Sequence, residues 1–161
     1  MRIFLAAIFT IFALPVWALS CLPQDLNRTF QEAAQSEDSF VIVVGKVTFD
    51  AKRLPVSKFG DQRAPKPNTL IPARINGQAL NHDGFGVPFT RDITLNVQCY
   101  GPWCGSMSSG QQYLAFLRKA KGRYQLDTNP CGGFAIGYPT KKQLEQVKTC
   151  FRGGACHPKK Y

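Results

Sequence analysis

Two stretches of the chain repeat their apolar side chains at the period of an α-helix. In residues 24–36 the apolar positions fall at i, i+4 and i+7, and Pro23 stands ahead of the first turn, where proline is tolerated. Near the other end, Thr140 and Gln143 form a capping-box pair at the start of a second stripe. The pattern therefore predicts one helix near each end of the domain. The two stripes consist of Leu26, Phe30 and Ala33, and of Leu144, Val147 and Phe151.

Between the two expected helices the pattern is that of β-strands. Residues 40–49 begin as a continuous apolar, β-branched run and alternate after Gly45, which predicts a strand that bends at the glycine. Residues 81–84 (Asn-His-Asp-Gly) carry turn chemistry. Further strands are expected at residues 70–80, 93–99, 113–117 and 124–126.

This order of elements predicts a mainly β fold. Short antiparallel strands with edges to protect usually close into a barrel, and a bend in a long first strand helps such closure. We expect a five-stranded, OB-like antiparallel barrel with an N-terminal and a C-terminal flanking helix. An immunoglobulin-like sandwich fits less well, because it needs about seven evenly spaced strands, which the pattern does not supply.

The first 18 residues have the pattern of a signal peptide. Arg2 precedes an apolar run, residues 3–14, which is shorter than the roughly 20 residues that span a bilayer. Small residues allow cleavage after Ala18 or after Ser20. We therefore expect a secreted or periplasmic protein whose single domain covers residues 19–161.

Export changes what the cysteines are expected to do. All six follow the leader, and an even number in an oxidising compartment predicts three disulfides, whose connectivity the spacing leaves open. A zinc site is not expected, because no CxxC pair occurs and His82 and His157 lie far apart. A thioredoxin-type site is rejected, because no second cysteine follows Trp103-Cys104-Gly105. The six are Cys21, Cys99, Cys104, Cys131, Cys150 and Cys156.

No constellation of catalytic side chains stands out in the sequence. Triad chemistry needs a histidine base, yet His82 lies in turn-like sequence and His157 lies close to the C-terminus. Asp83, Asp92 and Asp127 are scattered, and no phosphate-cradling glycine loop occurs. We expect a protein that binds and does not catalyse, with no cofactor and no metal.

Two segments carry much of the net positive charge of the chain, which is +10. One is a proline-rich loop, residues 51–68, and the other is the C-terminal stretch 141–161. Such charge either keeps an exported protein soluble or attracts an anionic glycan or envelope polymer. Nucleic acid is not expected as a partner, because the protein is exported and its strand aromatics are expected in the core. The polyanion-binding residues of the loop are expected to be Lys52, Arg53, Lys58, Arg63 and Lys66.

Short motifs in a shared order resemble a known family. Ser20-Cys21-Leu22-Pro23 is followed by Thr29-Phe30, then by Cys104-Gly105 and residues 110–116 (Gly-Gln-Gln-Tyr-Leu-Ala-Phe), and last by Cys131-Gly132-Gly133. Together they are similar to the netrin-like (NTR) module typified by tissue inhibitors of metalloproteinases (TIMPs), and the chain looks like a single-domain, bacterial-type member. The resemblance implies an OB-fold barrel in a monomeric, non-enzymatic module that contacts a protein partner or a protease.

The resemblance also implies a disulfide pairing and a contact surface. Its register pairs Cys21 with Cys131, Cys99 with Cys104, and Cys150 with Cys156, and Cys21–Cys104 is the rival pairing. The family's contact surface is an N-terminal ridge beside neighbouring loops. The residues expected there are Leu19, Ser20, Cys21 and Leu22, with Trp103 as a rigid anchor; the alternative for Trp103 is a cap on the barrel core.

Two alternatives concern the N-terminus of the mature chain. TIMPs chelate the zinc of their target protease with the amine and carbonyl of an N-terminal cysteine, and the matching residue here is Leu19. Cleavage after Ala18 leaves a free amine at Leu19, so metalloprotease inhibition stays an alternative, although the disulfide that would order the first residue is lost. The other alternative is a lipid anchor on Cys21, since Ala18-Leu19-Ser20-Cys21 partly resembles a lipobox.

Overall fold

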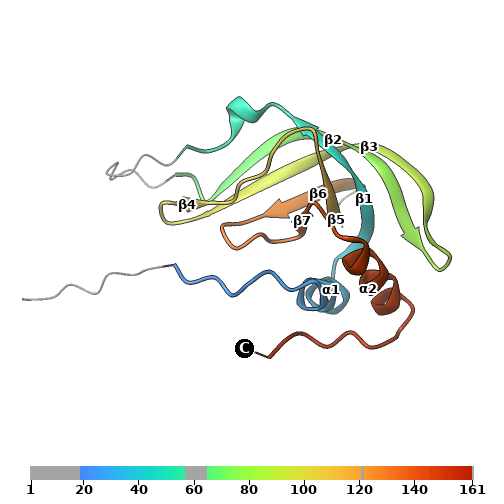
Figure 1. Cartoon of the computed structure of the whole chain (residues 1–161). Helices are drawn as coiled ribbons and strands as arrows, with labels where there is room; N and C mark the ends of the chain where they lie inside the picture. Colours follow the sequence, from blue (N-terminus) through green and yellow to red (C-terminus); the bar gives the residue numbers. More distant parts are fainter. Residues whose placement is uncertain (1–18, 57–64, 121, 161) are drawn as a thin grey trace, which may run out of the picture.

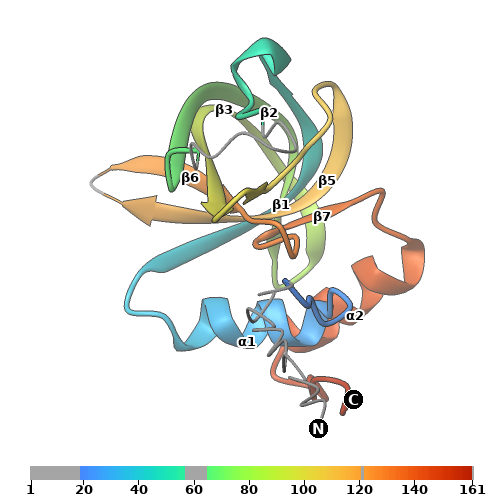
Figure 2. The same cartoon turned by 90° about the vertical axis from the view of Figure 1, so that its left-hand side faces the viewer.

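The computed structural model describes residues 19–56, 65–120 and 122–160, and the expected leader, residues 1–18, lies outside this range. Within it, both expected helices are confirmed as α1 (Leu26–Gln35) and α2 (Lys141–Phe151). The two helices lie side by side below the strands (Figures 1 and 2).

Each helix begins at a side-chain cap that the sequence supplies. The carboxylate of Asp25 accepts a hydrogen bond from the backbone N–H of Asn27 at the start of α1. Thr140 and Gln143 form the expected capping box of α2, each side chain bonding the backbone N–H of the other. The caps fix where each helix starts and therefore which face its apolar stripe presents.

Five strands close into a ring within the described residues. Their bounds, with those of two short strands and a 3-10 helix, are β1 (Ser39–Phe49), η1 (Ala51–Arg53), β2 (Asn68–Asn81), β3 (Gly84–Tyr100), β4 (Trp103–Cys104), β5 (Gln111–Ala120), β6 (Arg123–Thr128) and β7 (Ala135–Gly137). β1 pairs with β2, β2 with β3, β3 with β6, β6 with β5, and β5 returns to β1 (Figure 2). β4 pairs with β3, and β7 pairs with β5. The expected mainly β fold with two helices is confirmed.

One pair in the ring is parallel, which corrects the expectation of a wholly antiparallel sheet. β3 and β6 run in the same direction where residues 94–97 face residues 125–128, whereas the other four pairs are antiparallel. The reason is parity. Strand directions alternate between antiparallel neighbours, so an odd number of strands cannot close without one parallel pair.

Asp127 on β6 ties the parallel pair to its neighbours. Its carboxylate is buried and accepts hydrogen bonds from the side-chain amides of Asn96 on β3, at 2.7 Å, and Gln125, at 2.6 Å. Arg118 of β5 donates to its second oxygen at 3.2 Å and also pairs with Asp38, directly before β1. Because a buried carboxylate is costly unless it is paired and hydrogen-bonded, this network favours one closed arrangement of strands.

Apolar side chains are buried on both sides of the ring wall. The inner cluster contains the fully buried Val43, Ile75, Leu95 and Leu126. A second cluster lies between the outer face of β5 and the two helices, where Leu114 and Phe116 meet Leu26 and Val147. This explains why residues 113–117 are an unbroken apolar run, because successive side chains of β5 alternate between two buried environments.

Gly45, where the sequence predicts a bend in β1, lies where two glycines face each other. Gly45 of β1 is opposite Gly77 of β2. A Cβ on Gly45 would lie 2.6 Å from the carbonyl oxygen of Asn76, and one on Gly77 would collide with the Val44 carbonyl oxygen. Two strands approach this closely only because neither carries a side chain at the crossing.

Three disulfides fix the N-terminal segment, the β3–β4 hairpin and the C-terminal tail. They are Cys21–Cys131, Cys99–Cys104 and Cys150–Cys156, which confirms the expected pairing over the rival Cys21–Cys104. The first closes a loop of 110 residues, so the chain-entropy effect adds about 4–5 kcal/mol to the free energy of unfolding. Three disulfides indicate an oxidising, extracellular environment. None of the helices in the described ranges has the length and apolar character needed to cross a membrane.

We predict that Gly77→Ala lowers the free energy of unfolding by about 1–3 kcal/mol, because the added methyl forces β1 and β2 apart. Urea unfolding of the oxidised protein measures this. Gly86→Ala is the matched control, since a Cβ on Gly86 of β3 meets no atom within 4 Å. Equal stability of the two variants would contradict a crossing that requires glycine.

Candidate functional site

The N-terminal segment, residues 19–24, runs as an extended chain along the loop that links β6 to β7. The disulfide to Cys131 fixes Cys21, and the side-chain amide of Gln24 donates to the carbonyl oxygens of Gly133, at 3.3 Å, and Ala135, at 3.0 Å. Between these anchors Leu22 keeps 53% of its surface exposed. The segment is therefore held at two points while its apolar side chain faces solvent.

The loop that holds this segment needs glycine. The backbone N–H of Cys131 donates to the side-chain oxygen of Asn129, which forms a tight turn. Gly132 follows with a φ of +105°, and a Cβ there would lie 2.7 Å from the Gln24 amide nitrogen. The motif Cys131-Gly132-Gly133 thus has a local reason, since the backbone reverses directly against the N-terminal segment.

Trp103 lies on the hairpin formed by β3 and β4. Tyr100 pairs with Trp103 across the turn, and the Cys99–Cys104 disulfide joins the next pair of residues. Trp103 is 43% exposed and Tyr100 is 45% exposed. Trp103 therefore does not cap the core. It presents a half-exposed indole on a hairpin that a disulfide closes.

The hairpin and the N-terminal segment both lie beside the loop after β6, at one end of the ring. Gly105, directly after β4, packs so closely on Thr128 and Asn129 that a Cβ would lie 2.9 Å from the Asn129 backbone nitrogen. Asn129 also lines a cleft of about 250 Å³ between the segment and α1, together with Ser20 and Leu22. Figures 1 and 2 show β4, the loop after β6 and the N-terminal segment on the same side of the molecule. We call the exposed residues Leu19, Leu22, Tyr100 and Trp103, with loop 129–133, the ring-end surface.

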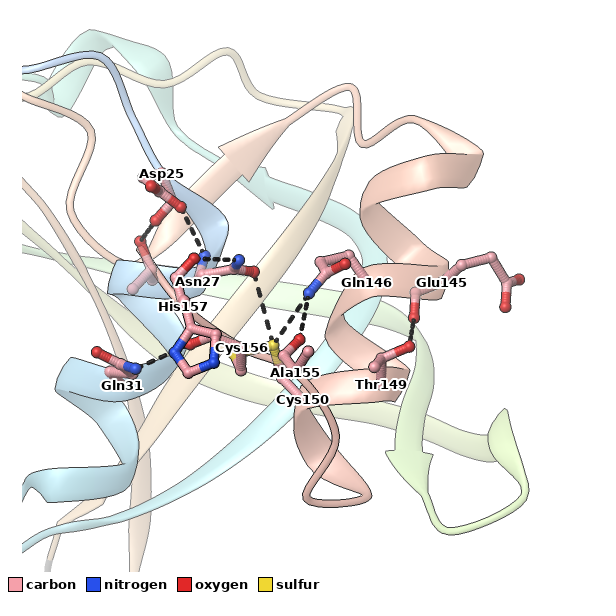
Figure 3. Close-up of a disulfide and its surroundings, with 11 residues drawn as sticks. Asp25, Asn27, Gln31, Glu145, Gln146, Thr149, Cys150, Ala155, Cys156 and His157 are labelled. Atoms are coloured by element: carbon pink, nitrogen blue, oxygen red, sulfur yellow. Dashed lines mark hydrogen bonds between the residues drawn. A yellow bond between two sulfur atoms is a disulfide. The ribbon is translucent and has the colours of Figure 1, made fainter. Parts of the chain in front are cut away.

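The C-terminal tail holds α1 in place through hydrogen bonds from α1 side chains (Figure 3). Along the helix, the side chain of Asn27 donates to the carbonyl oxygen of His157 and that of Gln31 to the carbonyl oxygen of Cys156, both at 2.8 Å. At the helix start, the second carboxylate oxygen of Asp25 accepts from the backbone N–H of Lys159 at 2.6 Å. The tail reaches this position because the Cys150–Cys156 disulfide turns it back from α2.

Asp25 thus joins the cap of α1 to the tail, and its ionisation is altered by this position. Burial of the carboxyl raises its pKa, but the hydrogen bonds from the backbone N–H groups of Lys159 and Asn27 outweigh that effect. The pKa of Asp25 is therefore lowered from its usual value. The charged form of this buried side chain is the one that the fold stabilises.

The remaining side chains that the sequence singled out lie elsewhere. His82 and His157 are both exposed, and the His82 ring packs edge-on against Phe151, 5.6 Å between centroids. In the ranges that the structure describes, no three His, Cys, Asp or Glu side chains group as metal ligands would. Of the five loop cations, Lys52 and Arg53 are exposed on η1 and Lys66 is exposed before β2, whereas Lys58 and Arg63 lie outside the described residues.

Sequence reasoning missed Tyr100, Gln24 and Asp25 as parts of this region. Tyr100 had a visible signal, since it and Trp103 flank a Gly-Pro turn between two cysteines. Gln24 and Asp25 had none, because their partners Gly133 and Lys159 are more than 100 positions away in the sequence.

Comparisons with known proteins assign no family to this chain. No protein-family model matches the chain, and no curated protein or solved structure is significantly similar to it. The likeness to the NTR and TIMP family therefore depends on the sequence motifs and stays a prediction.

We predict that Asp25→Asn destabilises the protein by about 1 kcal/mol near pH 7 and that the difference disappears in acid. The folded-state pKa is lowered, so the stabilisation is complete above the unfolded-state value of about 3.9 and is lost as the pH falls through the lower, folded-state value. Urea unfolding at a series of pH values measures it.

The control is Asp50→Asn, since Asp50 also caps a helical turn, η1, but lies exposed. Asparagine caps as well as aspartate, so this variant is expected to stay close to the parent in stability. A difference between Asp25→Asn and the parent that persists unchanged in acid would contradict the assigned role of the carboxylate.

Proposed function

We propose that the protein is an exported, non-enzymatic binding module that contacts a protein partner through the ring-end surface. The observation that carries this proposal is the exposure of four large apolar side chains at one end of a disulfide-linked ring. Exposed apolar patches of this kind mark interaction sites, and rigid aromatic anchors supply most of the binding energy in protein interfaces.

These side chains stand on backbone that disulfides fix, which favours a role in binding. Disulfides lie directly beside Leu22 and Trp103, so the loss of main-chain entropy on contact is small. Tyrosine and tryptophan also lose little side-chain entropy for the area they bury. A partner with an apolar groove would therefore meet a surface that is already arranged.

Strand order supports an OB-like barrel of the NTR and TIMP type as the architecture behind this surface. In favour are the five-membered ring with one parallel pair, the helix ahead of β1, the helix after the last strand, and the disulfide between the N-terminal segment and the loop after β6. In that family the N-terminal ridge and the neighbouring loops form the contact surface, which corresponds to the ring-end surface here.

Inhibition of a metalloprotease is the second candidate function. Leu19 and Ser20 are exposed directly ahead of the fixed Cys21, so cleavage after Ala18 would place a free amine at the edge of the surface. A lipid anchor is a weaker alternative, because acylation of Cys21 and its disulfide to Cys131 exclude each other.

We predict that a photo-crosslinking amino acid at position 22 or 103 captures the same partner from the native extracellular milieu. The same probe at Gln78, exposed on β2 away from this surface, should capture none. Unlabelled parent should compete, whereas Trp103→Ala should compete at least about 30-fold less well, with its free energy of unfolding changed by less than about 1 kcal/mol. Equal competition by Trp103→Ala, or equal capture from position 78, would contradict the proposal.

We predict for the second candidate that mature protein beginning at Leu19 inhibits a zinc endopeptidase, and that one added N-terminal alanine abolishes inhibition. The added residue removes the amine from the chelating position but leaves the ring-end surface in place. Inhibition assays with purified zinc endopeptidases test this, and crosslinking from position 103 should be unchanged. Inhibition that survives the added residue would rule out the amine as the ligand.

A further inference from the structure

The ring has an open seam beside the parallel pair. β3 runs from Gly84 to Tyr100, but β6 covers its free edge only from Thr94 onwards. Before Thr94, β3 is paired with β2 alone, and the two strands extend as a ribbon beyond the rest of the ring (Figure 1). A cleft of about 410 Å³ lies in this seam, between β3 and the start of β6.

Two arginines face this cleft without a carboxylate partner. Arg91 and Arg123 both line it, both are exposed, and neither forms an ion pair within the described ranges. The acidic residue at the cleft, Asp92, is paired with Arg74 at 2.6 Å. The cleft therefore carries two uncompensated guanidinium groups.

Two contacts support the Arg91 guanidinium in its position at the cleft. Its guanidinium lies 5.8 Å from the centre of the Phe89 ring, and its Nη1 donates to the carbonyl oxygen of Thr90 at 2.9 Å. Phe89 packs edge-on against Tyr124, the aromatic residue that lines the other side of the cleft, with 5.3 Å between ring centroids. Binding an anion here would cost little ordering of Arg91.

We infer that this cleft binds an acidic sugar, bearing carboxylate or sulfate, within an extracellular anionic glycan. Guanidinium groups bind such oxyanions through paired hydrogen bonds, which gives a preferred geometry that lysine does not. The uncovered backbone edge of β3 and the hydroxyl of Thr94 offer further polar groups for sugar hydroxyls, and Tyr124 offers apolar surface. A volume of 410 Å³ is in the range of small-ligand sites.

The two arginines of the cleft differ from the described cations of η1 in that they line a cleft. Lys52 and Arg53 lie exposed on η1 and line none of the described clefts. They therefore contribute positive charge but do not form part of a shaped site. Glycan is favoured over nucleic acid because three disulfides indicate an extracellular environment. The inference does not depend on the ring-end surface, whose residues are all different.

The test is calorimetric titration of the oxidised mature protein with a heparin-derived hexasaccharide at several salt concentrations. Arg91→Ala/Arg123→Ala should weaken binding at least about tenfold and reduce the slope of log affinity against log salt by about 2. Lys52→Ala/Arg53→Ala removes the same charge and should change affinity less than about twofold. Arg91→Lys/Arg123→Lys keeps the charge and should still lose most of the affinity, because the paired hydrogen bonds are lost.

Each contrary outcome overturns the inference. If the parent protein does not bind the hexasaccharide, the cleft is not a glycan site. Equal loss in the η1 variant, or full affinity in the lysine variant, would mean that net charge alone attracts the glycan. Tighter binding of a single-stranded oligonucleotide of equal charge would assign the cleft to nucleic acid. Thermal unfolding of all three variants checks that the ring stays folded.

Discussion

Closing a ring with five strands forces one parallel contact, and much of the molecule follows from where that contact lies. It occupies four residue pairs between β3 and β6, residues 94–97 against 125–128. A parallel pair cannot be joined by a tight turn, so the chain must leave and return between these strands. The carboxylate of Asp127, with Asn96 and Arg118 bonded to it, links β3, β6 and β5 at this place.

Both proposed binding regions lie where β3 runs past this contact. Before Thr94 the edge of β3 is uncovered, which leaves the cleft between Arg91 and Arg123. After Val97 the strand continues to Tyr100 and turns back as β4, which gives the hairpin that carries Trp103. A strand of 17 residues with a short parallel partner therefore contributes residues to both proposed sites.

Much of the fold could be predicted because local pattern and burial agree. The unbroken apolar runs of β1 and β5 are strands with two buried faces, and the Thr140–Gln143 box starts α2 as its sequence indicates. The first half of β3, which contains Gly86 and Pro88, was not among the expected strands. Proline and glycine are tolerated there because that edge has no partner strand. The parallel pair needed the strand count and the ring closure together, which no local pattern contains.

The two candidate sites also differ in whether the sequence could predict them. Leu22 and Trp103 could be singled out because cysteines beside them mark fixed positions in the chain. The cleft could not, because Arg91 and Arg123 belong to different strands and only the seam brings them together. Along β3, Arg91 in the cleft and Tyr100 in the hairpin are roughly 30 Å apart at the rise of an extended strand. If both proposals hold, a glycan and a protein would bind without competing for a shared residue, since the two sites have no residue in common. The basic end would then hold the module on a polymer while the aromatic end meets the partner. The two affinities would combine through local concentration and not through a conformational change.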